Sequence, residues 1–161
     1  MPSRELQVAV ERTGGVTEIR LAGTIDEHAA AALQRGFSNP VGTIRLNLRD
    51  VQRINSFGIG ILMRHLGAVS AQHKVEFGEC SDVIVDQFQM LDFSRYGRIT
   101  SFFARYLCQR CEAQESFLLV IGRDLQVDKR SGSVRAPEFP CSCSGSFAVD
   151  DSLEFVIEHL D

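Results

Sequence analysis

"TIRLNLRDVQRINSFGIGILMRHLGAV", residues 43–69, contains the two patterns that decide the fold class of this chain. Its first part alternates Ile44, Leu46 and Leu48 with polar residues, which is typical of a strand with one covered face. Its second part places apolar residues on one helical stripe. We therefore expect a strand followed directly by a helix, with a shared core that contains these positions: Ile44, Leu46, Leu48, Ile59, Leu62 and Leu66.

The segments before this stretch predict a hairpin and a helix. Residues 6–10 and 16–21 alternate apolar and polar residues, and Gly14-Gly15 between them supplies the turn that a β-hairpin needs. Residues 24–37 are rich in alanine and have apolar residues at helical spacing, with Asp26 as the expected cap. The chain is therefore expected to open with two antiparallel strands and a first helix.

The segments after this stretch continue the alternation. Residues 74–80 predict a short strand, residues 81–91 predict an amphipathic helix begun by Ser81, and residues 97–107 predict a further strand. The resulting order ββαβαβαβ predicts a parallel or mixed sheet, with the hairpin adding an antiparallel strand at one side. The expected fold class is therefore α/β, with a mixed β-sheet flanked by helices.

Length, composition and charge limit the classes of function. A chain of 161 residues with 44% hydrophobic residues can bury one ordinary core and has room for a small appended module. Residues 1–94 carry 9 Lys and Arg against 11 Asp and Glu, and residues 95–161 carry 8 against 10, so each part has a net charge of −2. Neither part has the basic excess of a phosphate-backbone binder. No stretch resembles a signal peptide or a membrane span, so a cytoplasmic location is expected.

Four of the five cysteines form two clusters in the second part of the chain. Cys108 and Cys111 form a Cys-x-x-Cys pair, and Cys141 and Cys143 form a Cys-x-Cys pair followed by Gly145. Four thiolates from two separated clusters predict a closed, structural zinc site within a small β module that ends in a short helix. A redox pair at Cys108 and Cys111, and former ligands that no longer hold metal, remain alternatives.

Two further residues of metal-binding type lie outside these clusters. Cys80 ends a predicted strand, and we expect it to be a buried free thiol. His159 has no partner at ligand spacing, and we expect it on the surface of the terminal helix.

The start of the second helix is the other candidate site. Ser and Asn are preferred N-caps, and we expect Ser56 to cap this helix. A phosphate on Ser56 would add about −1.5 to −2 charges near the positive end of the helix dipole. Gly58 and Gly60 are unfavourable inside a helix, so both positions indicate close approach of another backbone.

Residues 6–94 resemble a STAS domain, the fold of anti-sigma factor antagonists and of the cytoplasmic tails of sulfate transporters. The resemblance rests on "LAGTIDEHAAAAL", "IRLNLRDVQRINSFGIGILMRHL" and "VEFGECSDVIVDQFQMLDF", in that order. The family turn usually reads Asp-Ser-Ser/Thr-Gly, so Ser56 corresponds to the hydroxyl that an anti-sigma kinase phosphorylates, and Gly58 to the glycine. Asn55 replaces the aspartate, and Phe57 replaces the second small polar residue.

The resemblance implies a protein-binding module without catalysis, divided into a STAS-like domain at residues 1–94 and a zinc-ribbon-like module at residues 95–161. It implies binding of a regulatory protein, such as an anti-sigma-type kinase, through a turn that contains Asn55, Ser56, Phe57 and Gly58. An accessory subunit of a membrane transporter is the alternative. Nucleic-acid binding through the ribbon is a third, because several cations could line one hairpin although acidic residues interrupt them. These cations are Arg123, Lys129, Arg130 and Arg135.

Overall fold

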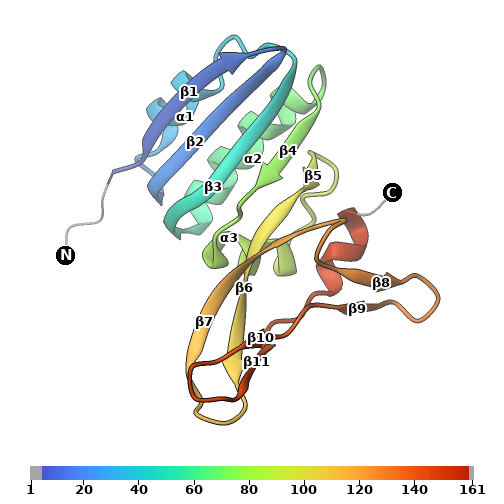
Figure 1. Cartoon of the computed structure of the whole chain (residues 1–161). Helices are drawn as coiled ribbons and strands as arrows, with labels where there is room; N and C mark the ends of the chain where they lie inside the picture. The colour runs from blue at the N-terminus through green and yellow to red at the C-terminus, as the bar shows by residue number, and fades with distance from the viewer. Residues whose placement is uncertain (1–4, 160–161) are drawn as a thin grey trace.

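The computed structural model describes residues 5–159, which form two main β-sheets joined end to end and a smaller two-stranded sheet (Figure 1). The first sheet has the strand order β1-β2-β3-β4-β5 and the second has the order β10-β11-β6-β7. This mixed α/β architecture confirms the predicted fold class. The first sheet contains β1 (Gln7–Thr13), β2 (Val16–Ile25), β3 (Thr43–Ile54), β4 (Val75–Gly78) and β5 (Arg98–Ile99), with helices α1 (Ala30–Gly36), α2 (Ser56–Ser70) and α3 (Asp82–Met90) between its strands. The second contains β6 (Ser101–Cys108), β7 (Gln114–Val120), β10 (Phe139–Pro140) and β11 (Ser146–Val149).

The opening hairpin of the first sheet forms as the sequence predicts. β1 pairs with β2 in antiparallel fashion, while β2, β3, β4 and β5 pair in parallel. Gly14 and Gly15 form the turn with φ of 58° and 78°, values in the left-handed region that glycine adopts at low cost. The sheet is therefore mixed, with its one antiparallel strand at the edge.

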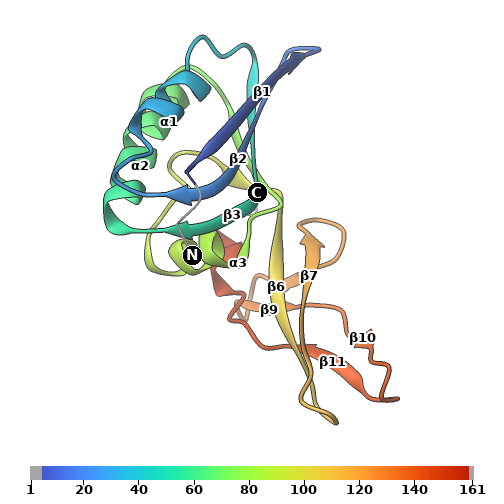
Figure 2. The same cartoon turned by 90° about the vertical axis from the view of Figure 1, so that its left-hand side faces the viewer.

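Helices α1 and α2 cover one face of the first sheet and leave the other face open (Figure 2). The apolar positions of β3 and α2 meet on the covered face, and their burial confirms the predicted register. The six predicted core residues are all buried: Ile44, Leu46, Leu48, Ile59, Leu62 and Leu66. These residues hold β3 against α2, and so fix where α2 begins.

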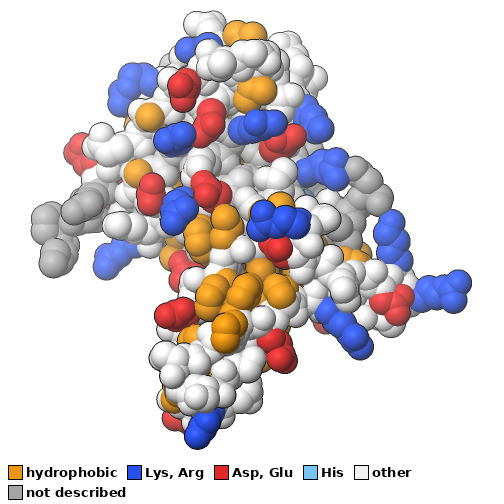
Figure 3. Space-filling model, viewed as in Figure 1, with side chains coloured by type: hydrophobic (Ala, Val, Ile, Leu, Met, Phe, Trp, Pro, Cys, Tyr) orange, Lys and Arg blue, Asp and Glu red, His pale blue; other side chains and the backbone are white. Residues whose placement is uncertain are grey.

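The open face of the first sheet is polar. Arg45 pairs with Glu76 at 3.0 Å, and Arg49 pairs with Glu79 at 3.3 Å. Figure 3 shows charges of both signs interspersed over this face. Such mixed charge suits a surface that remains in contact with water.

The last described residues return to the first sheet. The strands β8 (Gln126–Asp128) and β9 (Ser133–Arg135) form a separate hairpin between β7 and β10, and the 3-10 helix η1 (Glu154–His159) follows β11 and ends the described chain. His159 is buried, and its Nδ1 accepts a hydrogen bond from the Ile99 N–H at 3.1 Å. The expected surface position of His159 is therefore wrong, because η1 packs against the end of the first sheet.

Arg105 of β6 also joins the two sheets. Its guanidinium donates to Asp86 of α3 at 2.9 and 3.0 Å and lies 3.4 Å from Asp151. The hydrogen bonds to Asp86 raise the pKa of Arg105 further above its usual value. Because β5 lies beyond residue 94 and pairs with β4, the first sheet extends past the predicted division of the chain.

Two predicted helix caps differ in the structure. Asp26 does not cap α1, because its carboxylate accepts from the His28 N–H at 2.9 Å and the helix begins later, after Ala29. Ser81 does precede α3, but its hydroxyl donates to the Val51 carbonyl at 2.8 Å and makes no capping bond. None of the helices within residues 5–159 is long and apolar enough to cross a membrane.

Candidate functional site

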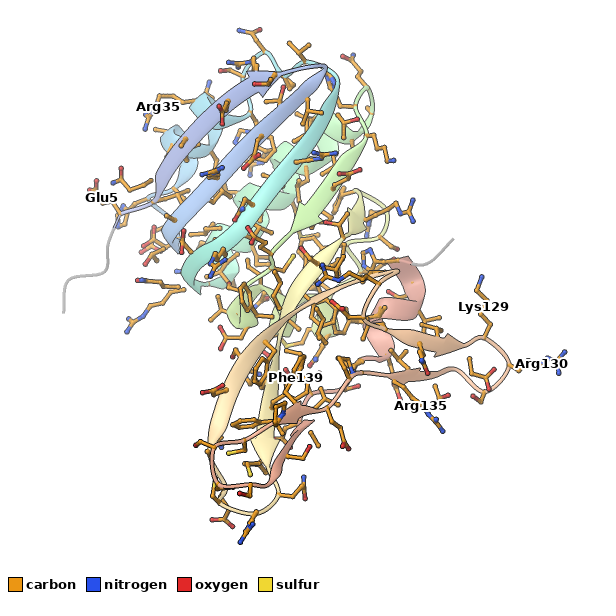
Figure 4. All side chains as sticks on the ribbon, viewed as in Figure 1. Glu5, Arg35, Lys129, Arg130, Arg135 and Phe139 are labelled. Carbon is orange, nitrogen blue, oxygen red and sulfur yellow. The ribbon has the colours of Figure 1, made fainter. Side chains whose placement is uncertain are left out.

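Four cysteines meet at the far end of the second sheet, where two turns lie side by side (Figure 4). Cys108 is the last residue of β6, and Cys111 lies in the turn to β7. Cys141 follows β10, and Cys143 lies in the turn to β11. Phe147 of β11 lies opposite Cys108, so the pairing of β11 with β6 brings the two turns together. We call these two turns the cysteine tip.

The four sulfur atoms are close enough to share one metal ion. All four lie within 4.8 Å of one another. The Cys108 and Cys143 sulfurs are 3.5 Å apart, and the Cys111 and Cys141 sulfurs are 3.7 Å apart. A tetrahedron with metal–sulfur distances of about 2.3 Å has sulfur–sulfur edges of about 3.8 Å. The cluster therefore fits a metal site with four thiolate ligands. Each of these two sulfur–sulfur contacts, at 3.5 and 3.7 Å, lies between a cysteine of one turn and a cysteine of the other.

The two turns differ by one residue. In the first, the Glu112 N–H donates to the Cys108 carbonyl at 3.0 Å, and in the second the Ser144 N–H donates to the Cys141 carbonyl at 3.1 Å. Glu112 and Ser144 both adopt left-handed φ, at 62° and 70°. The second turn is tighter because its two cysteines are separated by one residue and not by two. Both of its sulfurs still point into the cluster.

Backbone groups favour negative charge on the sulfurs. The N–H groups of Cys111 and Arg110 lower the pKa of the Cys108 thiol to about 6. The Gly145 N–H donates to the Cys143 sulfur at 3.3 Å and favours its thiolate, but burial and the neighbouring sulfurs raise the pKa of Cys143 to about 12. Four thiolates at these distances repel one another unless a cation lies among them. Metal binding here would therefore release protons.

Gly145 is required by the packing of the cysteine tip. A Cβ atom at Gly145 would lie 2.8 Å from the Arg110 Cβ, 3.0 Å from the Cys108 sulfur and 3.1 Å from the Cys143 sulfur. These contacts are shorter than van der Waals separations, so a side chain here would displace the sulfurs. The glycine after the second cysteine pair, visible in the sequence, thus belongs to the site.

The position of Cys108 and Cys111 argues against the redox alternative. A thioredoxin-like pair lies near a βαβ unit, whereas this pair lies in a turn between two antiparallel strands. Two further cysteine sulfurs also complete the cluster. Cys80 is separate and fully buried, as predicted, and burial raises the pKa of its thiol.

The start of α2 is capped by Asn55 and not by Ser56, which corrects the predicted cap. The Asn55 Oδ1 accepts from the Gly58 N–H at 2.9 Å, and the Asn55 carbonyl accepts from the Ile59 N–H at 2.9 Å. Ser56 is the first residue of the helix, and it is exposed. An asparagine with extended backbone is a preferred N-cap, and here it occupies the one position from which the side chain reaches Gly58.

The glycines of α2 differ in their surroundings. A Cβ at Gly58 would collide with the Ile25 backbone, so the predicted close approach is confirmed at this position. At Gly60 a Cβ would meet nothing within 4 Å, so no backbone of the described residues approaches this position, and approach by a partner stays a prediction. The close contact with the end of β2 explains why the turn requires a glycine after Phe57.

The surface around the start of α2 combines an exposed aromatic ring with a polar depression. The Phe57 side chain is 68% exposed. Beside it, the Asn55 Nδ2 donates to the Glu27 carboxylate at 2.9 Å, and this hydrogen bond lowers the pKa of Glu27. Glu27 and Asn55 line a depression of about 510 Å³ at the carboxyl ends of β2 and β3. Ligands of parallel sheets bind at such strand ends.

The structure therefore brings the four predicted cysteines together and leaves residues 55–58 as a separate surface on the first sheet. The chain matches no protein-family model, and no curated protein matches its sequence significantly. Sequence reasoning missed Arg105 and its carboxylate partners, since no local pattern signals contacts between residues so distant in the chain.

Proposed function

We propose that this chain is a non-enzymatic interaction module of the STAS type, similar in role to an anti-sigma factor antagonist, that binds a regulatory protein through the start of α2. The strand order β1-β2-β3-β4-β5, with helices between parallel strands, supports a STAS-like first domain. The single observation that carries the proposal is the exposure of Phe57, 68%, at a capped helix start.

Phe57 is suited to a docking role because its burial by a partner would remove a large aromatic surface from water. Aromatic anchors contribute much of the free energy of binding at protein interfaces. The turn that carries Phe57 is rigid, since Asn55 caps the helix and Gly58 packs against the Ile25 backbone. A turn that is already ordered reduces the conformational entropy that the backbone loses on binding.

Ser56 supplies the proposed switch. It is exposed, and its side chain is not needed for the cap, so phosphorylation would add negative charge without removing a capping bond. The added charge would lie next to Glu27 and Asp26 at the neighbouring depression, where it would change the potential that a partner meets. An anti-sigma-type kinase is the proposed partner enzyme.

We also propose that the second sheet is a zinc-ribbon-like module in which Cys108, Cys111, Cys141 and Cys143 hold one structural zinc ion. Four thiolates complete a tetrahedral shell and leave no position for substrate, so the ion would serve to cross-link the two turns. Elemental analysis of the reduced protein is expected to give one zinc per chain, and its absence would contradict this part of the proposal.

Affinity purification from the native cell tests the docking proposal. Tagged wild type, Phe57→Ala and Val41→Ala are compared; Val41 is 53% exposed and precedes β3, at the opposite end of that strand from α2. Wild type and Val41→Ala are expected to retain the same regulatory protein, and Phe57→Ala to lose most of it. Ser56→Asp is expected to weaken binding through its charge. Equal retention by wild type and Phe57→Ala would contradict the proposal.

The same experiment distinguishes the two alternatives. Recovery of a permease or membrane ATPase would favour a transporter subunit, and salt-sensitive recovery of nucleic acid would favour the ribbon as an interface. Lys129, Arg130 and Arg135 project from the β8–β9 hairpin, away from the cysteine tip (Figure 4). Because these cations and the four cysteines form no common surface, the interaction module is the better supported function.

A further inference from the structure

The second sheet ends in a strand whose outer edge is free. β7 is the last strand of the order β10-β11-β6-β7, so it pairs only with β6. Beyond its end, the Ile121 N–H donates to the Thr100 carbonyl on the β6 side. Because backbone groups alternate along a strand, the N–H and C=O groups of Gln114, Ser116 and Leu118 point away from β6.

At one end of this edge an outward backbone N–H is hydrogen-bonded, and along the rest of the edge the outward backbone groups are free to pair. The Val120 N–H, which also points outward, donates to the Asp124 carboxylate at 2.7 Å. The segment from Gln114 to Leu118 contains no Pro, Gly or Lys, residues that commonly protect edge strands from pairing. Within residues 5–159, no hydrogen bond reaches the outward backbone groups of this segment. It is therefore available to another strand.

An apolar surface lies beside the free edge. Phe103 of β6 lies directly opposite Leu118 of β7, so their side chains share one face of the second sheet. Both are only half-buried, and the Arg49 guanidinium lies 5.3 Å from the centre of the Phe103 ring. A strand added to β7 would place alternate side chains on this surface.

Two depressions lie beside β7, on the sheet face that Ser116 shares with Phe103 and Arg105. One, of about 270 Å³, lies between Phe103, Ser116, the middle of β3 and the start of α3. The other, of about 280 Å³, lies between Ser116, Glu115 and Asp150. Asp82 and Ser116 line both, so the two depressions are continuous along the middle of β7.

The charge of this groove is negative. Both of its guanidinium groups are already paired: Arg49 with Glu79, and Arg105 with Asp82, Asp86 and Asp151. Other carboxylates that line the groove form no ion pair or side-chain hydrogen bond with any residue in the described part of the chain. These are Asp50 and Asp150. Glu115, which pairs with Tyr106, points to the other face of the sheet, and it too forms no ion pair within the described residues. The groove therefore presents more carboxylates than its own cations balance.

We propose that the edge of β7 from Gln114 to Leu118 is a strand-addition site for an extended, basic segment of a partner protein. Backbone hydrogen bonds to the outward groups of β7 would hold the segment. Because side chains alternate between the two faces, its apolar side chains would cover Phe103 and Leu118 on the groove face, and its Lys or Arg side chains would meet Glu115 on the other face. The unpaired carboxylates of the groove would add to the negative potential that attracts the segment. This interface is independent of the start of α2.

Charge also decides between a partner and a second copy of this chain. Antiparallel pairing of two β7 edges centred on Ser116 would bring Glu115 and the neighbouring carboxylates of both copies together. Like charges opposed in this way disfavour the pairing. A cationic segment instead neutralises them, so the groove fits a basic strand better than it fits itself.

Amide hydrogen exchange with a synthetic probe tests the proposal. The probe is a blocked nonapeptide of alternating Lys and Val at millimolar concentration, and its control alternates Glu and Val. The Lys peptide is expected to slow exchange of the Ser116 and Leu118 amides by about tenfold or more, whereas the Glu peptide leaves exchange unchanged. Amides on the free edge of β1 in the first sheet serve as an internal control, because a merely sticky peptide would protect them equally.

A proline tests the edge itself. Ser116→Pro removes an outward N–H and costs no bond to β6, so the fold is expected to remain, as the metal content and the protection of β6 amides would verify. Ser116→Pro should abolish protection of Leu118 by the Lys peptide, and the matched variant Ser116→Thr should retain it. The proposal is wrong if the Lys peptide does not protect the wild-type β7 amides, if it protects the β1 amides equally, or if the Glu peptide has the same effect. It is also wrong if Ser116→Pro binds the Lys peptide as wild type does, or if wild type forms dimers that Ser116→Pro dissociates.

Discussion

In the first sheet, Leu46 and Leu66 are fully buried between a strand and a helix, whereas at the cysteine tip Cys111 is exposed and Cys141 is only half-buried. The first sheet and the cysteine tip are therefore stabilised by different interactions. The first sheet excludes water from a continuous apolar core. The tip has short strands, β10 with two residues and β11 with four, and we propose that a metal ion held by its four sulfurs stabilises it.

Aromatic residues of the second sheet lie between the core of the first sheet and the cysteine tip. Tyr106 is buried in the second sheet, and its ring packs against Phe117 and Phe139 at 5.0 and 5.2 Å between centroids. The Tyr106 hydroxyl donates to the Pro137 carbonyl at 2.9 Å. Phe147 of β11 is also buried and packs against Phe117, so apolar packing continues from this cluster up to Cys108 at the tip.

Loss of the proposed zinc ion is expected to have the largest effect, confined to the tip. Cys111→Ser, or a strong chelator, should abolish zinc binding and the amide protection of β10 and β11, because structural zinc contributes on the order of 10 kcal/mol to small domains. Protection of β3 should remain. Exchange mass spectrometry measures both regions, and Ser142→Ala, in the same turn, is the matched control. Loss of protection in β3 as well would show that the two regions do not differ as argued.

Truncation of the apolar core is expected to destabilise the first sheet and to leave metal binding at the tip unchanged. Leu46→Ala should lower the free energy of unfolding by about 2–5 kcal/mol, since it leaves a cavity between β3 and α2. Zinc stoichiometry of the folded protein should not change. Denaturant titration measures the loss, with exposed Val41→Ala as the control expected within about 0.5 kcal/mol of wild type. A negligible effect of Leu46→Ala would remove the contrast between the regions.

Much of the first sheet could be predicted because its signals are local. Alternation in residues 43–48 and the helical stripe after residue 56 gave the correct elements and core, and Gly14-Gly15 marked the hairpin. The four cysteines were also predictable, because metal ligands combine a recognisable residue type with short spacing.

What the sequence did not reveal depends on distant contacts. His159 hydrogen-bonds to Ile99, 60 positions away, and no periodicity in its neighbourhood indicates that η1 folds back. Arg105 reaches α3 and Asp151 in the same non-local way. Asn55 and Ser56 are both good cap residues, and only the observed backbone decides which one caps α2.

The pH dependence of stability tests the contact where the tail meets the first sheet. Burial lowers the pKa of His159 below its ordinary value of 6.5. The unfolded chain then binds more protons than the folded chain between the two pKa values, so stability is complete above about pH 6.5 and falls as pH drops below it. His159→Gln cannot titrate, and thermal melts from pH 7 to about 5 should show a shallower decline for this variant. If the melting temperatures of wild type and His159→Gln declined equally with falling pH, His159 would not couple protonation to the packing of η1.

The smallest expected effect separates the two neighbours at the start of α2. Asn55→Ala should cost about 1 kcal/mol, because the Gly58 N–H loses its acceptor at 2.9 Å. Ser56→Ala should change stability by less than about 0.5 kcal/mol, because Ser56 is exposed and makes no capping bond. Asn55→Ser keeps a capping oxygen, adds no charge beside Glu27 and loses the same amide as Asn55→Ala, so it is the matched control, which should cost clearly less than Asn55→Ala in denaturant titration. A cost for Ser56→Ala equal to that of Asn55→Ala would contradict the assignment of the cap. If the costs differ as expected, Ser56 contributes little to folding, and any loss of partner binding by Ser56→Asp can be attributed to charge at the surface.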